Sequence, residues 1–234
     1  MTEDRGAKIA ESLHAVRARI DAAAKACGRD PASVALVAVS KTKSPEMIRE
    51  AYAAGQRAFG ENYAQELDDK AKALADLTDI AWHFIGHLQS NKAKLVARVT
   101  SLVHTVHSRD LAAELGKRAA ASSRAPLSVL VSVKLSEEDS KHGVPPSELG
   151  ALLEAIEKDE RLRLRGLMTM PPAEDLDVAK RVFEELVALR VRHGGSGRLP
   201  ELSMGMTHDL EVAIACGATI VRVGTAIFGD RSIV

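Results

Sequence analysis

Two patterns of apolar residues alternate along the chain. Short runs rich in β-branched residues, of which 34–39 is the first, are typical of strands buried on both faces of a sheet. After each of the first seven runs, apolar residues recur every three or four positions, which predicts an amphipathic helix. We therefore expect eight strands, at 34–39, 58–62, 81–86, 102–107, 127–135, 164–170, 201–206 and 219–228.

This alternation predicts the fold. Strands that alternate with helices form parallel sheets, and eight such repeats are the number that closes a (β/α)₈ TIM barrel. An open, doubly wound sheet is the alternative. The glycine-rich link at 194–197 is too short to divide the chain, so we expect a single domain over residues 1–234. An extra helix precedes the first strand, because apolar residues from Ile9 to Ile20 share one helical face.

Composition excludes several classes of function. The 32 basic and 32 acidic residues cancel, and aromatic residues make up 3% of the chain. Without a net positive field or aromatic side chains for base stacking, we expect neither nucleic acid nor an anionic membrane as a partner. No apolar run reaches the length of a membrane span, and Cys27 and Cys216 are too few for a disulfide framework. Acids such as Glu3 and Asp4 interrupt the first segment, so it is not a secretory signal, and we expect a cytoplasmic protein.

The carboxyl-terminal strand ends carry the candidate chemistry, because the loops at this end form the active face of a barrel. Lys41 ends the first strand, although a charge that simply extends into solvent also explains a lone lysine there. After the seventh strand, 203–207 offers a serine, a glycine and the N–H groups of a helix start; Gly224 and Thr225 follow on the eighth. Tight turns alone explain each glycine, but on adjacent strands they favour a phosphate site.

Arg222 lies inside the apolar eighth strand and needs acceptors there, because an unpaired buried charge is costly. An ion pair inside the barrel, for instance with Glu61, and a hydrogen bond to a ligand ring nitrogen are both open. His83 is more typical of a core histidine than of a catalyst. No histidine has metal-ligand spacing, and the chain has no nucleophile elbow, Walker loop or dinucleotide motif.

A lysine that faces a phosphate site suggests a Schiff base with a phosphorylated aldehyde. The reaction needs a neutral amine, and a free lysine is neutral only about one part in a thousand at pH 7. Burial and nearby cations such as Lys43 and Arg222 lower this barrier. Pyridoxal 5′-phosphate (PLP) matches the set, with its aldehyde at Lys41, its phosphate at Gly224 and Thr225, and its ring nitrogen at Arg222.

Six motifs together resemble one family. They are VSKTK at 39–43, FGENY at 59–63, WHFIGHLQSNK at 82–92, GLMTM at 166–170, SMGM at 203–206 and RVGTAIFG at 222–229. In this order, and over nearly the whole chain, they resemble the pyridoxal phosphate homeostasis protein family. Its PLP-binding barrels are related to the N-terminal domain of bacterial alanine racemase.

The resemblance implies a role for each site residue. Lys41 would form the internal aldimine, Arg222 would face the pyridine nitrogen, and Asn62 would lie near the ring hydroxyl. The phosphate would be held by Ser203, Gly205, Gly224 and Thr225. An arginine in place of an acid keeps the ring nitrogen unprotonated and weakens the ring as an electron sink. Family members are regarded as carriers or regulators of PLP and of amino- and keto-acid balance, without established catalytic turnover.

Two residues depart from the family pattern, and one loop matches it. Lys134 stands where asparagine is common, and Thr207 stands where serine is usual. Lys141 lies in a stretch that resembles the family's Ser-Lys-x-Gly, where it either exchanges with the cofactor or is a solvated loop lysine.

Three functions are consistent with these residues. The first is a monomeric PLP carrier or regulator that releases PLP to apo-enzymes. The second is a PLP-dependent amino-acid racemase; racemases that resemble this barrel take a second base, a tyrosine, from an added domain, whereas Tyr52 and Tyr63 are expected on helices here. The third is a Schiff-base aldolase without PLP, which Arg222 and the paired glycines disfavour.

Overall fold

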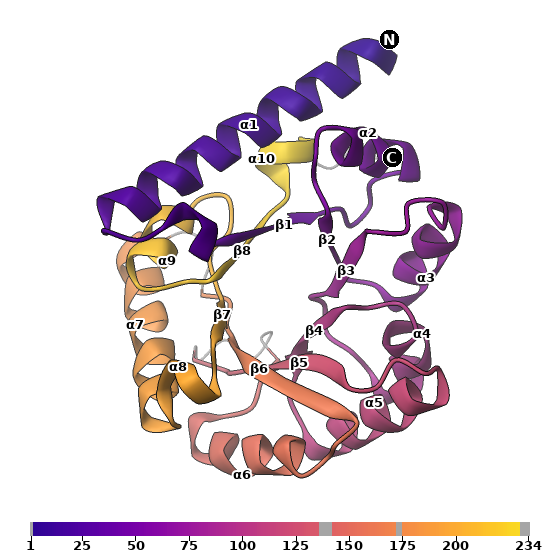
Figure 1. Ribbon diagram of the computed structural model, residues 1–234. Helices are drawn as coiled ribbons and strands as arrows, with labels where there is room; N and C mark the ends of the chain where they lie inside the picture. Colours follow the sequence, from indigo (N-terminus) through magenta and orange to yellow (C-terminus); the bar gives the residue numbers. More distant parts are fainter. Residues whose placement is uncertain (1, 136–141, 172–174, 230–234) are drawn as a thin grey trace.

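The strands form a closed barrel in the computed structural model, which describes residues 2–135, 142–171 and 175–229 (Figure 1). Each strand pairs with the next, and β8 pairs in parallel with β1 to complete the ring. This closure confirms the predicted TIM barrel and excludes the open sheet. The strands are β1 (Ala35–Val39), β2 (Ala58–Glu61), β3 (Ala81–Phe84), β4 (Leu102–Val106), β5 (Leu127–Ser132), β6 (Leu162–Met168), β7 (Glu201–Ser203) and β8 (Ile220–Val223).

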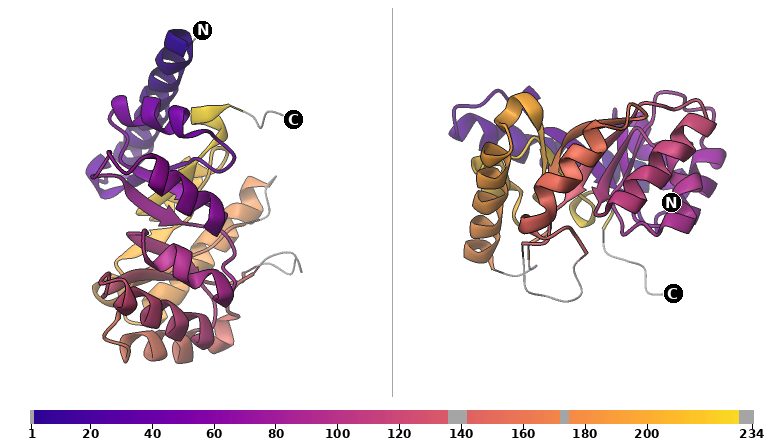
Figure 2. Two further views of the ribbon diagram at one scale, coloured as in Figure 1. Left: turned by 90° about the vertical axis from the view of Figure 1, so that its right-hand side faces the viewer. Right: turned by 90° about the horizontal axis from the view of Figure 1, so that it is seen from below.

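Helices surround the barrel, as the side views in Figure 2 show. The helix after β1 begins where the sequence has Ser44 as the N-cap residue, Pro45 in the first turn and Glu46 next to the positive end of the helix dipole. The helices after β1 are α2 (Pro45–Ala53), α3 (Ala64–Ala73), α4 (Ala93–Ala97), α5 (Arg109–Ala121), α6 (Pro146–Glu157), α7 (Leu176–Arg192), α8 (Gly195–Arg198), α9 (Leu210–Ala215) and α10 (Thr225–Phe228). Short 3₁₀ turns are η1 (Pro31–Ser33) and η2 (Ser90–Lys92).

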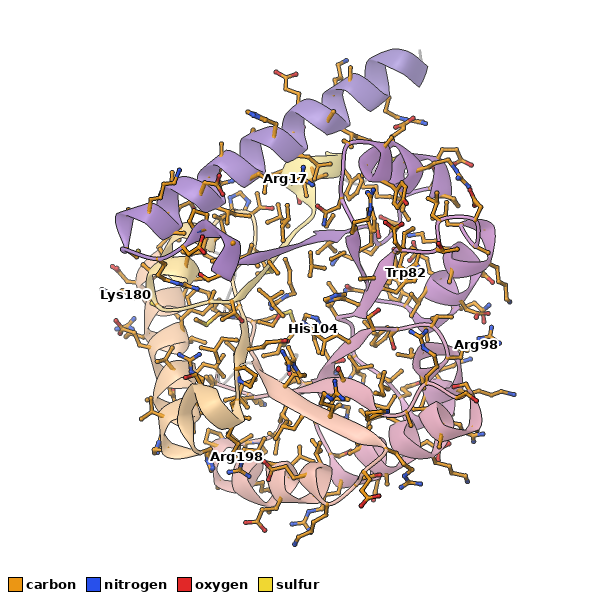
Figure 3. All side chains as sticks on the ribbon, in the orientation of Figure 1. Arg17, Trp82, Arg98, His104, Lys180 and Arg198 are labelled. Carbon is orange, nitrogen blue, oxygen red and sulfur yellow. The ribbon has the colours of Figure 1, made fainter. Side chains whose placement is uncertain are left out.

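Apolar side chains fill two layers. The outer layer lies between strands and helices, and its largest fully buried members include Phe59, Phe84 and Phe183. A second cluster is formed by one residue from each of five strands: Val37, Leu102, Leu130, Met168 and Ile220. We assign it to the inside of the barrel, where Figure 3 shows side chains converging around His104. The interior is therefore a packed core rather than a pore.

The predicted N-terminal helix is confirmed as α1 (Thr2–Ala26). Its apolar face, from Ile9 to Ile20, is buried. The helix packs against α2, α9 and α10 and crosses the side of the barrel where β1 meets β8 (Figure 1). It therefore ties the first segment of the chain to the last helix.

Several strands end earlier than predicted. β7 ends at Ser203 rather than 206, because Gly205 has φ +93°, which no extended strand adopts. β8 ends at Val223 rather than 228, and Thr225–Phe228 is a helical turn in which Ile227 and Phe228 are buried. A short apolar run is buried equally well as strand or helix, so apolar spacing did not distinguish them.

Candidate functional site

The predicted site residues lie on four neighbouring strands, β7, β8, β1 and β2. Lys41 follows β1 by two residues, and Asn62 follows β2 directly. The register pairs Val39 with Gly60, so Lys41 and Asn62 are at one level of the carboxyl-terminal mouth. Gly224 directly follows β8, which pairs with the other side of β1. The closed ring thus brings these residues to one side of one mouth.

Hydrogen bonds hold the turn that carries Lys41. Ser40 N–H donates to a carbonyl of β2 at 3.0 Å, and Lys43 N–H donates to the Ser40 carbonyl at 3.0 Å. Thr42 has φ +62°, and its N–H donates to Glu66 Oε1 at 2.6 Å. Lys41 itself is half-buried. Its backbone is therefore fixed on both sides before any ligand arrives.

Two carboxylates share one buried lysine beneath this turn. Lys70 Nζ donates to Glu61 Oε1 at 2.8 Å, to Glu66 Oε1 at 2.6 Å and to the Ser40 carbonyl at 2.7 Å. Ser40 Oγ donates to Glu61 Oε1 at 2.6 Å. Burial raises the pKa of Glu61 to about 7, against the opposing effect of Lys70. This cluster lies between β1, β2 and α3, so the ion pair of Glu61 is with Lys70 and not with Arg222.

Arg222 is enclosed in the barrel, with 3% of its surface exposed. One guanidinium nitrogen donates to Ser203 Oγ at 2.6 Å and the other to the Thr169 carbonyl at 3.0 Å. Burial lowers the pKa of Arg222 to about 10, so the side chain is still a cation at neutral pH.

Two histidines extend this contact across the barrel. His104 Nδ1 lies 2.8 Å from Ser203 Oγ, and His104 Nε2 lies 2.9 Å from His83 Nδ1. Burial lowers the pKa of His83 to about 4, and it lowers the pKa of His104 well below its ordinary value. Both rings are therefore neutral at pH 7. The expectation that His83 is a core histidine fits this arrangement, whereas the role of His104 was not predicted.

The position of Ser203 bears on one expected contact. Its side chain is fully buried and bonded to Arg222 and His104. Ser203 is in register with Ile220, four residues before Gly224 on β8. The hydroxyl therefore accepts a hydrogen bond from Arg222, and the contact of Ser203 with a phosphate stays a prediction.

The remaining phosphate candidates line the rim. A Cβ on Gly205 would lie 2.6 Å from the Ala213 side chain, and one on Gly224 would lie 3.2 Å from the Val39 carbonyl oxygen. Both positions therefore suit glycine, because neighbouring protein atoms pack close to the backbone there. Thr225 begins α10, whose first N–H groups have no partner within the helix.

The loop after β7 is tied down by an acid. Met206 N–H donates to Asp209 Oδ1 at 2.5 Å, and Asp209 is buried. The Thr207 carbonyl accepts a bond from Arg19 at 2.8 Å, which links this loop to α1. Asp209 precedes α9 but makes no side-chain cap hydrogen bond with it. The predicted anion site at the start of α9 is therefore weakened by a carboxylate.

A small cavity of about 120 Å³ lies at the mouth beside the end of β2. Asn62 lines it, and Asn62 Oδ1 is buried without a hydrogen-bond partner among the described residues. Three histidines that were not singled out for this mouth also line it: the His87 ring lies 3.8 Å from His142 and 4.9 Å from His107. Burial, and then His142 and His107, lower the pKa of His87.

Two further lysines were considered from the sequence, Lys134 and Lys141. Lys134 is half-buried, and its N–H donates to the Val144 carbonyl at 3.0 Å. Lys141 lies outside the described residues.

In the described ranges no three His, Cys, Asp or Glu side chains are grouped to hold a metal ion. Across the same ranges, every helix is too short or too polar to cross a membrane.

Barrel and mouth together define the class of protein. The family model described as alanine racemase, N-terminal domain, matches residues 12–232. The chain is 45% identical over 230 residues to the pyridoxal phosphate homeostasis protein of Escherichia coli K12. This alignment covers 95% of this chain and 97% of the Escherichia coli protein. The structure of PipY from Synechococcus elongatus with PLP bound matches with a TM-score of 0.83 and 38% identity, over 94% of this chain and all of PipY. The chain belongs to the pyridoxal phosphate homeostasis protein family.

Complete racemases are more distant. Alanine racemase from Corynebacterium glutamicum matches with a TM-score of 0.68 and 17% identity, over 96% of this chain and 62% of the racemase. At this identity the likeness shows a shared barrel and nothing about activity.

Proposed function

We propose that this chain binds PLP through Lys41 and serves the homeostasis of PLP and of amino and keto acids, without catalytic turnover. One observation carries the proposal: Lys41, Arg222 and Gly224 lie on two adjacent strands, β1 and β8, toward one mouth of the barrel. When bound, PLP supplies an aldehyde that bonds reversibly to an amine. The names of the relatives and the PLP-bound PipY structure support the same ligand.

The residues present fit the three polar ends of PLP. The unpartnered Asn62 Oδ1 offers a buried hydrogen-bonding group for the ring hydroxyl. Arg222 can only donate, so it suits an unprotonated ring nitrogen. Gly224 brings its backbone close to Val39 at the mouth, where a Cβ would lie 3.2 Å from the Val39 carbonyl oxygen, and Thr225 adds a hydroxyl and a backbone N–H beside it.

Each residue then has one task. Lys41 provides the amine from a turn fixed by Ser40 and Glu66. Gly205, Gly224 and Thr225 hold the phosphate, and Asn62 orients the ring. Ser203 changes role in this proposal, because its hydroxyl holds the guanidinium of Arg222.

A racemase would need a second base close to the ring. The Tyr52 hydroxyl is bonded to Asp79, and the Arg57 guanidinium lies 3.8 Å from the Tyr52 ring. Tyr63 is the residue before α3 rather than part of a helix as expected, and 55% of its surface is exposed. Neither tyrosine lines the cavity beside Asn62. The binding role therefore fits better than turnover.

The test compares two neighbouring lysines. Purified protein with added PLP should show a visible absorption band, and borohydride reduction followed by mass spectrometry should place the label on Lys41. Lys41→Ala should lose both signals. Lys43→Ala is the matched control, because Lys43 Nζ instead donates to the carbonyls of Phe228 and Gly229 at 3.2 and 3.0 Å. A colourless wild type, or a label on another lysine, would refute the proposal.

The proposal also covers the oligomeric state, the cellular location and the recipients of PLP. We propose a cytoplasmic monomer that passes PLP to apo-enzymes. Sedimentation of the PLP-loaded protein should give the mass of one chain. Mixing it with an apo-aminotransferase, in the presence of a trap that removes free PLP, should restore transaminase activity. The Lys41→Ala variant should restore none. Activity of pure loaded protein in racemising alanine would instead support the enzyme alternative.

A further inference from the structure

A second cavity opens at the opposite end of the barrel. Its volume is about 480 Å³, and it is lined by residues at the amino-terminal ends of the strands. His83, Arg163 and Glu201 are among them. We call it the lower cavity. None of the PLP-site residues proposed above lines it, so it needs an explanation of its own.

A chain of hydrogen bonds connects Arg222 to this cavity. It runs from Arg222 to Ser203 Oγ at 2.6 Å, on to His104 at 2.8 Å and from there to His83 at 2.9 Å. A guanidinium can only donate, so Ser203 Oγ accepts at its upper end. If Ser203 donates its own hydrogen onward, His104 Nδ1 accepts it. A neutral ring carries one N–H, so His104 Nε2 then donates to His83 Nδ1, and His83 Nε2 carries the last hydrogen.

The reverse direction leaves a group unpaired. If His104 donated to Ser203, the Ser203 hydroxyl hydrogen would have no acceptor among the described residues, at a site with no exposed surface. A buried donor without an acceptor is strongly disfavoured. The forward direction gives an acceptor to the Ser203 hydroxyl hydrogen and to the ring N–H of His104. At the lower end of the chain it leaves His83 Nε2–H as a donor, on a ring that lines the lower cavity.

The charges around the lower cavity favour an anion as well. Arg165 makes two bonds to Glu201 Oε1, at 2.9 and 2.6 Å, and so neutralises that acid. Arg163 is exposed at the same cavity and makes no ion pair or hydrogen bond with a described residue. Arg163 and the His83 N–H therefore face the same space as the Arg165–Glu201 pair, in which Glu201 Oε2 is buried without a partner among the described residues. The two arginines and one carboxylate leave a net positive charge.

We propose that the lower cavity binds a small oxyanion, a phosphate or a carboxylate, held by His83 Nε2–H and the Arg163 guanidinium. The oxyanion supplies the acceptor that the hydrogen-bond chain lacks at its lower end, and it offsets the charge of Arg163. The site is separate from the PLP site, and the two lie at opposite ends of one hydrogen-bonded chain.

The test uses the protein without PLP, so its result does not depend on PLP binding. Long-range ¹H–¹⁵N NMR of ¹⁵N-histidine-labelled protein should show His83 and His104 with hydrogen on Nε2. Sodium phosphate, added at constant ionic strength against chloride, should shift the His83 Nε2 signal along a saturable curve. Arg163→Gln should weaken this binding about tenfold or more, the factor for losing one charge-assisted hydrogen bond.

Arg181→Gln is the matched control, because Arg181 is an exposed arginine on α7 that does not line the cavity. It should leave the titration unchanged, and circular dichroism should show that both variants keep their fold. Hydrogen on His83 Nδ1, a shift that never saturates, or an equal effect of both substitutions would overturn the proposal. A curve that Arg163→Gln leaves unchanged would also overturn it, because it would place the phosphate elsewhere, for example at Gly224.

Discussion

Arg222 is a cation whose hydrogen-bond partners are dipoles rather than a carboxylate. Within the described ranges its guanidinium makes no ion pair and is bonded to the Ser203 hydroxyl and the Thr169 carbonyl. A buried charge held in this way contributes little to stability. Its retention therefore agrees with a role toward a ligand rather than with a role in holding the barrel together.

Ser203→Ala should be disproportionately destabilising for a change of one oxygen atom. It removes the acceptor of a buried guanidinium bond and the partner of His104, so the free energy of unfolding should fall by about 1–3 kcal/mol. Urea denaturation measures this. Ser101→Ala, at an exposed serine, should change the same quantity by less than about 0.5 kcal/mol. Equal effects of the two substitutions would show that the hydrogen bonds of the Ser203 hydroxyl do not contribute to stability.

Glu61 should make stability fall as the pH rises from about 4.5 to 7. Its carboxyl titrates near 4.5 in the unfolded chain and at about 7 in the folded protein. Between these values the folded state binds more protons than the unfolded state, so raising the pH favours unfolding. The full effect is about 3 kcal/mol.

Glu61→Gln isolates this effect, because glutamine keeps an acceptor for Lys70 and has no proton to lose. The free energies of unfolding of both proteins are measured by urea denaturation from pH 4.5 to 7.5. The value for the wild type minus the value for Glu61→Gln should fall steadily as the pH rises. A difference that is flat or moves the other way would mean that Glu61 is ionised throughout and that Lys70 outweighs its burial.

At the scale of elements, the loop after β7 depends on one glycine. Gly205→Ala would combine a φ of +93° with a Cβ 2.6 Å from the Ala213 side chain. Gly195→Ala is the matched control, because Gly195 also has a positive φ of +69° but open space around it. The control should lose about 1 kcal/mol of stability through strain alone. Gly205→Ala should lose about 1–3 kcal/mol more through overpacking, and it alone should weaken PLP binding in a spectral titration.

Element types could be read from the sequence more securely than element ends. The eight strands and α1 follow from apolar spacing, because burial on one or both faces imposes that spacing. The ends of β7 and β8 do not follow from that spacing, because they depend on the backbone angles of Gly205 and on the packing of α10 against α1. That error matters for function: it moves Thr225 from a strand to a helix start.

The candidate site shows the same division. The position of Lys41 and Asn62 at the mouth could be predicted because each lies at the carboxyl-terminal end of an apolar run, and parallel strands bring such positions to one mouth. The direction of the Ser203 side chain could not, since it depends on which residue is the last of β7. Lys70 left no signal either, because a lysine on an amphipathic helix is normally solvated, and only the tertiary fold buries it beside Glu61.

For the whole molecule, ring closure brings the two ends of the chain together. β1 pairs with β8, and α1 packs on α10, which begins at Thr225. The phosphate end of the proposed site is therefore supported by a helix from the other end of the sequence. That the closed ring unfolds as a single domain stays a prediction.

Two equally buried leucines can separate this support from general stability. Leu13 lies on α1 and Leu153 lies on α6, and neither has exposed surface. Either change to alanine should lower the free energy of unfolding by about 2–5 kcal/mol, through lost burial and a residual cavity. Only Leu13→Ala should also weaken PLP binding, by severalfold, because the cavity forms in the layer where α1 packs on α10. Denaturation and spectral titration at a temperature where both variants are folded measure the two effects. Equal PLP affinities in the two variants would mean that the barrel rim holds Gly224 and Thr225 without help from α1.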